Sequence, residues 1–196
     1  MAFKGSEKLK KNIAIFASGT GSNTLKIIQY FEEHPFIHIG LIVSNKTDAG
    51  VLIIAHTHHI PTLILEKDEF YKNAYLNEFR RKDIDFIVLA GFLWKIPSKL
   101  IAAYPNKIIN IHPALLPGYG GKGMYGYHVH EAVIAAKEKQ SGITIHYVDE
   151  KYDHGSTIFQ ATCDIEENDT PEILAQKIHV LEHQYFPVII EKIVSN

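Results

Sequence analysis

The chain has 196 residues, of which 46% are apolar and 21% charged, and its formal net charge at pH 7 is -2. This composition is sufficient for one well-cored domain, so we expect a single domain over residues 1–196. Lys and Arg are scattered along the chain and create no field that would collect tRNA or DNA, so we expect small-molecule substrates and no nucleic-acid partner.

The N-terminal segment, residues 1–11, is charged and precedes only a short apolar run. It therefore resembles neither a signal peptide nor a membrane anchor, and we expect it to be flexible. Cys163 is the single cysteine, which excludes an internal disulfide and suits a reducing compartment. We expect Cys163 to be a thiol in the hydrophobic core. We expect the protein to be cytoplasmic, to be a monomer or a homodimer, and to have no membrane partner.

Short β-rich runs alternate with longer helical patterns, which is typical of parallel strands joined by crossover helices. The expected strands are residues 12–18, 37–44, 62–65, 85–91, 107–112, 142–148 and 157–165. The expected helices are residues 23–33, 49–58, 69–82, 97–103 and 129–139, with a closing helix from Pro171. The predicted fold class is α/β, a doubly wound, mostly parallel, Rossmann-like sheet with helices on both faces. Ligands of such sheets bind at the carboxyl ends of the strands.

The loop that leaves the first strand reads ASGTGSNT, residues 17–24. Gly19 and Gly21 permit a tight turn, and Ser22 or Asn23 can cap the next helix, which makes an anion site at a helix N-terminus. The loop lacks the third glycine of a dinucleotide fingerprint and the lysine of a Walker A loop. We therefore predict that it binds a single phosphate on a small metabolite, and a capped turn without a ligand is the alternative.

The fifth strand ends in NIHPALLP, residues 110–117. Asn110 and His112 are two residues apart, so their side chains project from the same face at the carboxyl end of the strand. An amide and an imidazolium that converge on one point can stabilise an oxyanion at a carbonyl carbon. Pro113 would stiffen the turn that presents them. A histidine buried only for packing is the alternative.

A carboxylate partner for His112 is available in the segment VDEKYDHGS, residues 148–156. Asp149, Glu150 or Asp153 could lie beside the imidazole, and spacing does not choose among them. We expect that carboxylate to raise the pKa of His112 and to stabilise its cationic form.

Five segments in chain order carry a resemblance to a known family: SGTGSN, VLAGF, NIHPALLP, GITIHYV with DEKYDHG, and LEHQYFP. Together they resemble the folate-dependent formyltransferase family, and SGTGSN is similar to its glycinamide ribonucleotide branch. The resemblance implies transfer of a formyl group from 10-formyltetrahydrofolate to the amine of 5′-phosphoribosylglycinamide in purine biosynthesis, without a metal. Hydrolysis of formyltetrahydrofolate by the same residues is the alternative, but water needs no phosphate site.

The resemblance also implies a set of site residues. The catalytic residues would be Asn110, His112 and Asp153. The phosphate and sugar of the ribonucleotide would contact Gly21, Ser22, Asn23, Thr24, Leu25 and Glu182. The folate would contact Lys72, Leu93, Trp94, Lys95, Ile96, Asn110, Thr144 and His146, although Trp94 stands where the family commonly has an arginine. Residues 118–126 are expected to form a mobile loop, with Lys122 near the entrance of the site.

Two more distant interpretations remain. The histidines of HTHH (56–59) and YHVH (127–130) could belong to a metal-dependent hydrolase or a metal-binding module. His128 and His130 would diverge on a helix, so we expect surface histidines and no metal site. A ligand-sensing domain without catalysis would leave Asn110, His112 and Asp153 with no role.

Overall fold

A computed structural model describes residues 10–72 and 74–195 of the chain. The expected flexible segment, residues 1–11, lies mostly outside the described residues, but Lys11 begins the first strand. No helix in the described ranges is long and apolar enough to cross a membrane.

Seven strands and seven helices are assigned in the described residues. The strands are β1 (Lys11–Phe16), β2 (Ile37–Ser44), β3 (Thr62–Ile64), β4 (Ile84–Leu89), β5 (Ile108–His112), β6 (Gln140–Tyr147) and β7 (Thr157–Asp164). The helices are α1 (Ser22–Phe31), α2 (Gly50–Thr57), α3 (Lys67–Tyr71), α4 (Leu76–Arg81), α5 (Ser98–Ala103), α6 (Tyr127–Ala135) and α7 (Pro171–Val194).

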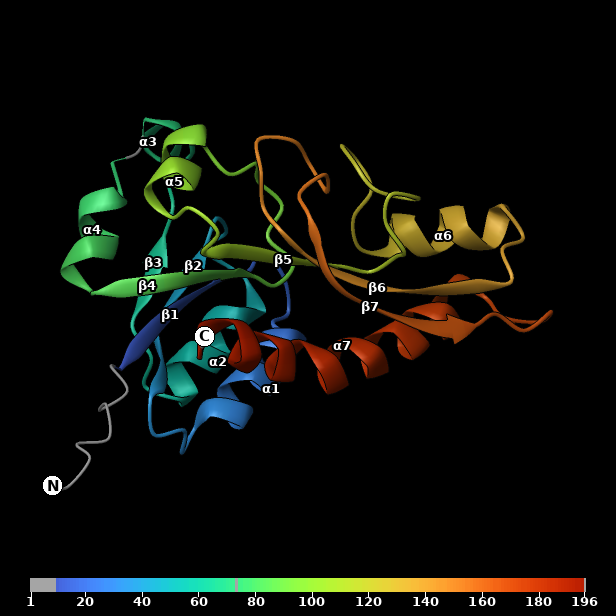
Figure 1. Ribbon diagram of the computed structural model, residues 1–196, viewed down its shortest axis with the longest axis horizontal. Helices are drawn as coiled ribbons and strands as arrows, with labels where there is room; N and C mark the ends of the chain where they lie inside the picture. The colour runs from blue at the N-terminus through green and yellow to red at the C-terminus, as the bar shows by residue number, and fades with distance from the viewer. Residues whose placement is uncertain (1–9, 73, 196) are drawn as a thin grey trace, which may run out of the picture.

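The seven strands form one sheet in the order β3-β2-β1-β4-β5-β6-β7. The first five strands pair in parallel, whereas β6 and β7 are antiparallel additions at one side. Helices α1, α2 and α7 lie on one face of the sheet and α3, α4 and α5 on the other (Figure 1). This arrangement confirms the predicted α/β class with a mostly parallel, doubly wound sheet.

Strand β1 shows how the sequence pattern fills both layers. Ile13 and Ile15 pack into the core under α1 and α7, whereas Ala14 and Phe16 pack into the core under α3 to α5. All four side chains are fully buried, as expected for a central parallel strand covered on both faces. Cys163 is half-buried against the first of these cores, not fully inside it.

The helix expected over residues 69–82 is wrong as a single element, because the chain forms two short helices, α3 and α4. Phe70 and Phe79 are nine residues apart, so in one straight helix they would face about 180° away from each other. Both are instead buried in the same core. The break between the helices lets both rings pack against the sheet.

The pairing of β5 with β6 brings together residues from distant parts of the sequence. Asn110 lies opposite His146, and His112 lies opposite Thr144. Because β1, β4 and β5 run in parallel, the loops that follow them meet at one edge of the sheet.

Candidate active site

A cavity of about 720 Å³ opens at this edge of the sheet. Its walls come from the loops after β1, β4 and β5, from residues 121–126, and from helices α6 and α7. A cavity of this volume is within the range of sites that enclose small organic ligands.

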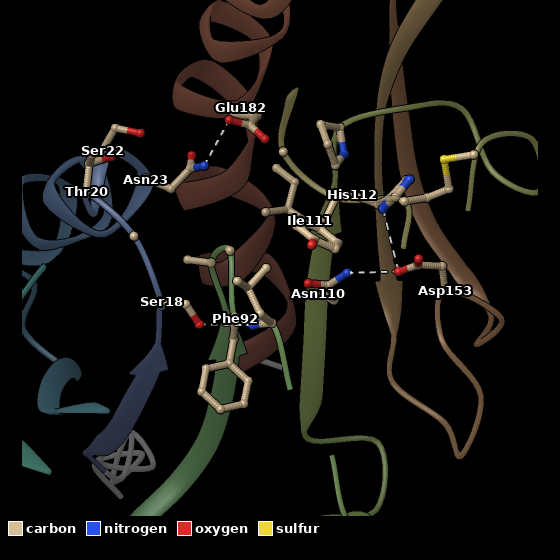
Figure 2. A pocket seen from close by; sticks show the side chains of 18 of the residues that line it. Ser18, Thr20, Ser22, Asn23, Phe92, Asn110, Ile111, His112, Asp153 and Glu182 are labelled. Atoms are coloured by element: carbon tan, nitrogen blue, oxygen red, sulfur yellow. Dashed lines mark hydrogen bonds and ion pairs between the residues drawn. The ribbon is translucent and has the colours of Figure 1, made fainter. Parts of the chain in front are cut away.

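Asn110, His112 and Asp153 meet on one side of the cavity (Figure 2). Asn110 Nδ2 lies 3.4 Å from Asp153 Oδ1, and His112 Nδ1 lies 3.6 Å from the same oxygen. The geometry selects Asp153 from the three acidic candidates, since Asp149 pairs with His154 at 2.8 Å instead. Asp153 has a positive φ of 52°, an uncommon conformation for a side chain other than glycine. The turn after β6 thus aims its carboxylate at the ends of β5.

The hydrogen bonds assign the tautomer of each ring in the site. His112 Nε2–H donates to the carbonyl of Tyr119 at 2.8 Å, so in the neutral ring Nδ1 carries the lone pair. His146 Nδ1–H donates to the carbonyl of Tyr147 at 2.8 Å, and its Nε2 can therefore accept from Asn110 Nδ2 at 3.1 Å. His146 is buried beside the cavity and fixes which end of the Asn110 amide faces Asp153.

Burial lowers the pKa of His112 below its ordinary value, and the charge of Asp153 offsets this only in part. Asp153 raises the pKa of His112 as expected, but burial lowers it by more, so the expectation that the free protein holds His112 in its cationic form was wrong. His112 is 3% exposed. The free energy needed to remove its imidazolium from water is larger than the attraction of one carboxylate at this distance. Burial also opposes ionisation of Asp153, but the positive charge that His112 carries at acid pH and the N–H of Gly121, which donates to Asp153 Oδ2 at 2.9 Å, lower the pKa of Asp153. Near pH 7 the free site therefore holds a neutral imidazole beside a carboxylate.

The glycine loop forms the opposite end of the cavity. Helix α1 begins at Ser22, its N-cap is Gly21, and no side chain in the described part of the chain caps it. The expectation that Ser22 or Asn23 caps the helix was wrong, because Asn23 Nδ2 donates to Glu182 Oε2 at 2.9 Å (Figure 2). The first-turn N–H groups thus have no side-chain cap, as an anion site requires. Lys46 also lines the cavity, and the sequence interpretation missed it.

The other residues expected to hold the ribonucleotide lie at different depths. Gly21, Ser22, Asn23 and Glu182 line the cavity. Thr24 is fully buried in α1, and neither Thr24 nor Leu25 is part of the lining. Burial raises the pKa of Glu182, and the hydrogen bond from Asn23 lowers it only in part.

Only part of the expected folate set reaches the cavity. Leu93 lines it, whereas Trp94 packs on Phe70, Tyr71 and Phe92. Three other members lie elsewhere: Ile96 is buried in the core under α3 to α5, Lys95 is exposed, and Lys72 pairs with Glu69 at 3.3 Å. His146 was also expected to line this pocket, but it is buried and is not part of the cavity lining. Phe92 and Tyr152 line the cavity beside Leu93 and were not expected.

Thr144 was expected to line the cavity, but the structure buries it behind His112. Its hydroxyl donates to the carbonyl of Ala114 at 2.7 Å and accepts from the N–H of Leu116 at 2.9 Å and from Gln160 at 2.9 Å. Thr144 is fully buried and not part of the cavity lining. It thus holds the turn that follows His112.

We expect Thr144→Val to lower the free energy of unfolding by about 1–3 kcal/mol, because buried backbone groups of the turn lose their partner. The turn then shifts, so kcat should fall about tenfold with little change in either KM. Thr144→Ser keeps the hydroxyl and should restore kcat. Steady-state kinetics and urea unfolding of both variants test this, and a normal kcat in Thr144→Val would show that the turn is held by other contacts.

The histidines considered as metal ligands do not gather. In the described ranges, no group of three or more His, Cys, Asp or Glu residues is placed to hold a metal ion. His128 is exposed and pairs with Glu131 at 3.1 Å. His130 was also expected at the surface, but it is 4% exposed and lines the cavity. Two residues along a helix differ by about 200°, which turns His130 inward while His128 faces solvent.

Burial and the charges of His179 and His112 lower the pKa of His130 from 6.5 to about 4. Between these two values the unfolded chain binds more protons than the folded protein, so the free energy of unfolding falls as the pH falls. The full shift corresponds to on the order of 3 kcal/mol. We expect the loss between pH 7 and pH 5, measured by urea unfolding, to be smaller in His130→Asn than in the wild type.

Other groups set the background of that comparison. His112 contributes with the same sign, because its pKa is also lowered. Glu182 opposes it, since its raised pKa makes the folded protein bind the additional proton. The contribution of His130 is therefore read from the difference between wild type and His130→Asn in the free energy of unfolding lost between pH 7 and pH 5. An equal loss in the two proteins would refute it.

Comparison with known proteins shows the family. The chain matches the formyl transferase family over residues 11–190. It is 37% identical over 191 residues to the phosphoribosylglycinamide formyltransferase of Bacillus subtilis, covering 94% of this chain and 95% of that protein. It is 39% identical over 191 residues to the chloroplastic phosphoribosylglycinamide formyltransferase of Arabidopsis thaliana, covering 94% of this chain. The match spans 65% of the Arabidopsis protein's length, less than two thirds of it.

A solved structure agrees with these relatives. The crystal structure of phosphoribosylglycinamide formyltransferase from Bacillus halodurans superposes with a TM-score of 0.86 at 38% identity, covering 95% of this chain and 96% of that one. The resemblance carried by the five sequence segments is thereby confirmed. The chain belongs to the formyl transferase family.

Proposed function

We propose that the protein transfers a formyl group from 10-formyltetrahydrofolate to the amine of 5′-phosphoribosylglycinamide. One observation carries the proposal: a helix N-terminus without a side-chain cap and the group Asn110, His112 and Asp153 border the same cavity. A substrate with a phosphate at one end and a nucleophile at the other fits that arrangement. Family membership and the names of the relatives support the same activity.

The reaction begins when the neutral amine attacks the formyl carbon. A new C–N bond forms and the carbonyl electron pair moves onto the formyl oxygen. The Asn110 amide is placed to donate to that oxygen. Its hydrogen bond to Asp153 is long, at 3.4 Å, and therefore weak, so the same N–H can turn toward the substrate oxygen.

The proton of the attacking nitrogen then needs an acceptor. The neutral ring of His112 offers the Nδ1 lone pair at the cavity, and Asp153 at 3.6 Å stabilises the imidazolium that forms. The Nδ1–H of this imidazolium donates to the oxyanion and then delivers the proton to the folate nitrogen. The C–N bond to the folate breaks, which leaves the formylated amine and tetrahydrofolate.

The two ligands occupy different parts of the cavity. The phosphate contacts the N–H groups at Gly21 and Ser22, with Lys46 adding positive charge, and Glu182 contacts the sugar or the glycinamide. The folate lies along Leu93 and Tyr152. Of the residues expected earlier to contact folate, Asn110 and Leu93 remain in this proposal as direct contacts.

The setting of this activity is part of the same proposal. The chain would work as one formyltransferase domain, as a monomer or homodimer, on small molecules in the cytoplasm, without a metal, nucleic acid or membrane. The free thiol of Cys163 suits that reducing compartment.

The test is the release of tetrahydrofolate from 10-formyltetrahydrofolate, followed spectroscopically with and without glycinamide ribonucleotide. We expect release that depends on the ribonucleotide. Release at the same rate without it would indicate a hydrolase, and no release in either case would refute both activities.

A further inference from the structure

Polar side chains from three helices line the same cavity as the glycine loop and the catalytic group. Asn23 comes from α1, His130 from α6, and His179 and Glu182 from α7. Asn23 and Glu182 bond to each other, and His179 Nε2 lies 4.0 Å from Glu182 Oε2. The mechanism above assigns no role to His130 or His179, and of these two His130 is the buried one.

His130 combines burial with an unused polar atom. The ring is 4% exposed, and its Nδ1 has no hydrogen-bond partner among the described residues. The Oδ1 atom of Asn23 is buried and unpaired in the same sense. Leaving such an atom unpaired costs free energy, so a ligand that reaches it binds more tightly.

The charges of His179 and of the catalytic His112 both lower the pKa of His130, so its ring lies near both, and this position indicates which part of a ligand it meets. A molecule with its phosphate at Gly21 and its amine at His112 has its sugar and amide between these ends. Both are uncharged groups that donate and accept hydrogen bonds. His130 matches them, because a buried ring with a pKa lowered to about 4 is neutral near pH 7 and offers one donor and one acceptor.

We propose that His130 is a specificity-determining residue that hydrogen-bonds the uncharged ribosyl–glycinamide portion of the acceptor substrate. This inference rests on the proposed function and adds a contact from α6 to the phosphate contacts at α1. A substrate that has the phosphate and the amine but lacks the polar groups between them would gain no binding affinity from His130.

The test compares His130→Phe with the wild type and with His128→Phe. Phenylalanine keeps a ring but cannot hydrogen-bond. We expect the KM for glycinamide ribonucleotide to rise about tenfold in His130→Phe, as the loss of one buried hydrogen bond predicts, with the KM for 10-formyltetrahydrofolate unchanged within about twofold. His128 lies on the same helix but is exposed and outside the cavity lining, so His128→Phe should leave both constants unchanged.

His130→Asn guards against misfolding, because its amide can replace a ring nitrogen without added volume. It should bind the ribonucleotide more tightly than His130→Phe, and thermal unfolding of each variant reports on the fold. A KM for the ribonucleotide within about twofold of wild type in a folded His130→Phe would overturn the inference, and so would an equal rise in both KM values.

Calorimetric titration with glycinamide ribonucleotide separates this inference from the proposed function. If the wild type transfers no formyl group, the function fails, yet weaker ribonucleotide binding by His130→Phe would still support the contact and equal or absent binding would overturn it. Inhibition by ribose 5-phosphate locates the contact: weaker inhibition of His130→Phe assigns it to the sugar, and unchanged inhibition assigns it to the amide.

Discussion

Replacing Asp153 with asparagine is expected to lower kcat by about two to three orders of magnitude, the range of a general acid–base contribution. Asn keeps the size of the side chain but removes the charge that, in the proposed mechanism, stabilises the His112 imidazolium. The KM for the ribonucleotide should change by less than about threefold, because Asp153 lies beside His112 and not at Gly21, where we propose that the phosphate binds. Steady-state kinetics with both substrates measures the split.

A matched control lies in the same turn. Glu150 is exposed and is not part of the cavity lining, so Glu150→Gln removes the same charge without touching His112. It should retain the wild-type kcat within about twofold, since exposed charges contribute little. A near-normal kcat in Asp153→Asn would remove Asp153 from the mechanism.

Gly21→Ala should damage both the fold and the proposed phosphate site. Gly21 has a φ of 84°, and a Cβ added there would lie 2.9 Å from the Cα of Val51. Backbone strain and the clash together should lower the free energy of unfolding by about 2–4 kcal/mol. Because the turn must move, the N–H groups of α1 leave their position, and the KM for the ribonucleotide should rise more than about tenfold.

Gly19→Ala is the control that shows whether any alanine in this loop destabilises the protein or only one at Gly21. A Cβ at Gly19 meets nothing within 4 Å, and Gly19 does not have the positive φ of Gly21. Its free energy of unfolding should change by less than about 1 kcal/mol. Urea unfolding of both variants measures the difference, and equal stability of the two would refute the account of Gly21.

Most of the fold could be predicted because local patterns determine it. The strands around Ile13, Ile87 and Ile109 are apolar on both faces, which already indicates a central parallel sheet. The break between α3 and α4 could not be predicted, because it depends on Phe70 and Phe79 packing against the same face of the sheet. That requirement is tertiary and does not change the local helical pattern.

The site could be predicted where one strand or one loop carries it. Asn110 and His112 are neighbours on β5, and the glycine loop is continuous in sequence. The ionisation of His112 could not be predicted, because it depends on burial and on the carbonyl of Tyr119. Thr144 lies opposite His112 in the sheet, yet its hydroxyl bonds the turn behind it instead of the cavity.

His130 shows the same limit for helices. Its spacing from His128 indicated that the two rings diverge, but not which of them faces inward. Packing of α6 on α7 decides this, since Val129 and Val133 are buried in the same core as Leu174 and Ile178. Knowing the neighbour of α6 in advance would have identified His130.

The fate of a labelled formyl carbon tests the central claim most directly. The wild-type enzyme, in excess over 10-formyltetrahydrofolate labelled with carbon-13 in the formyl group, is mixed with glycinamide ribonucleotide, and the products of one turnover are read by NMR. We predict that the label appears in the formamide of the ribonucleotide and that no free formate forms. Label in formate, with the ribonucleotide unmodified, would contradict the account.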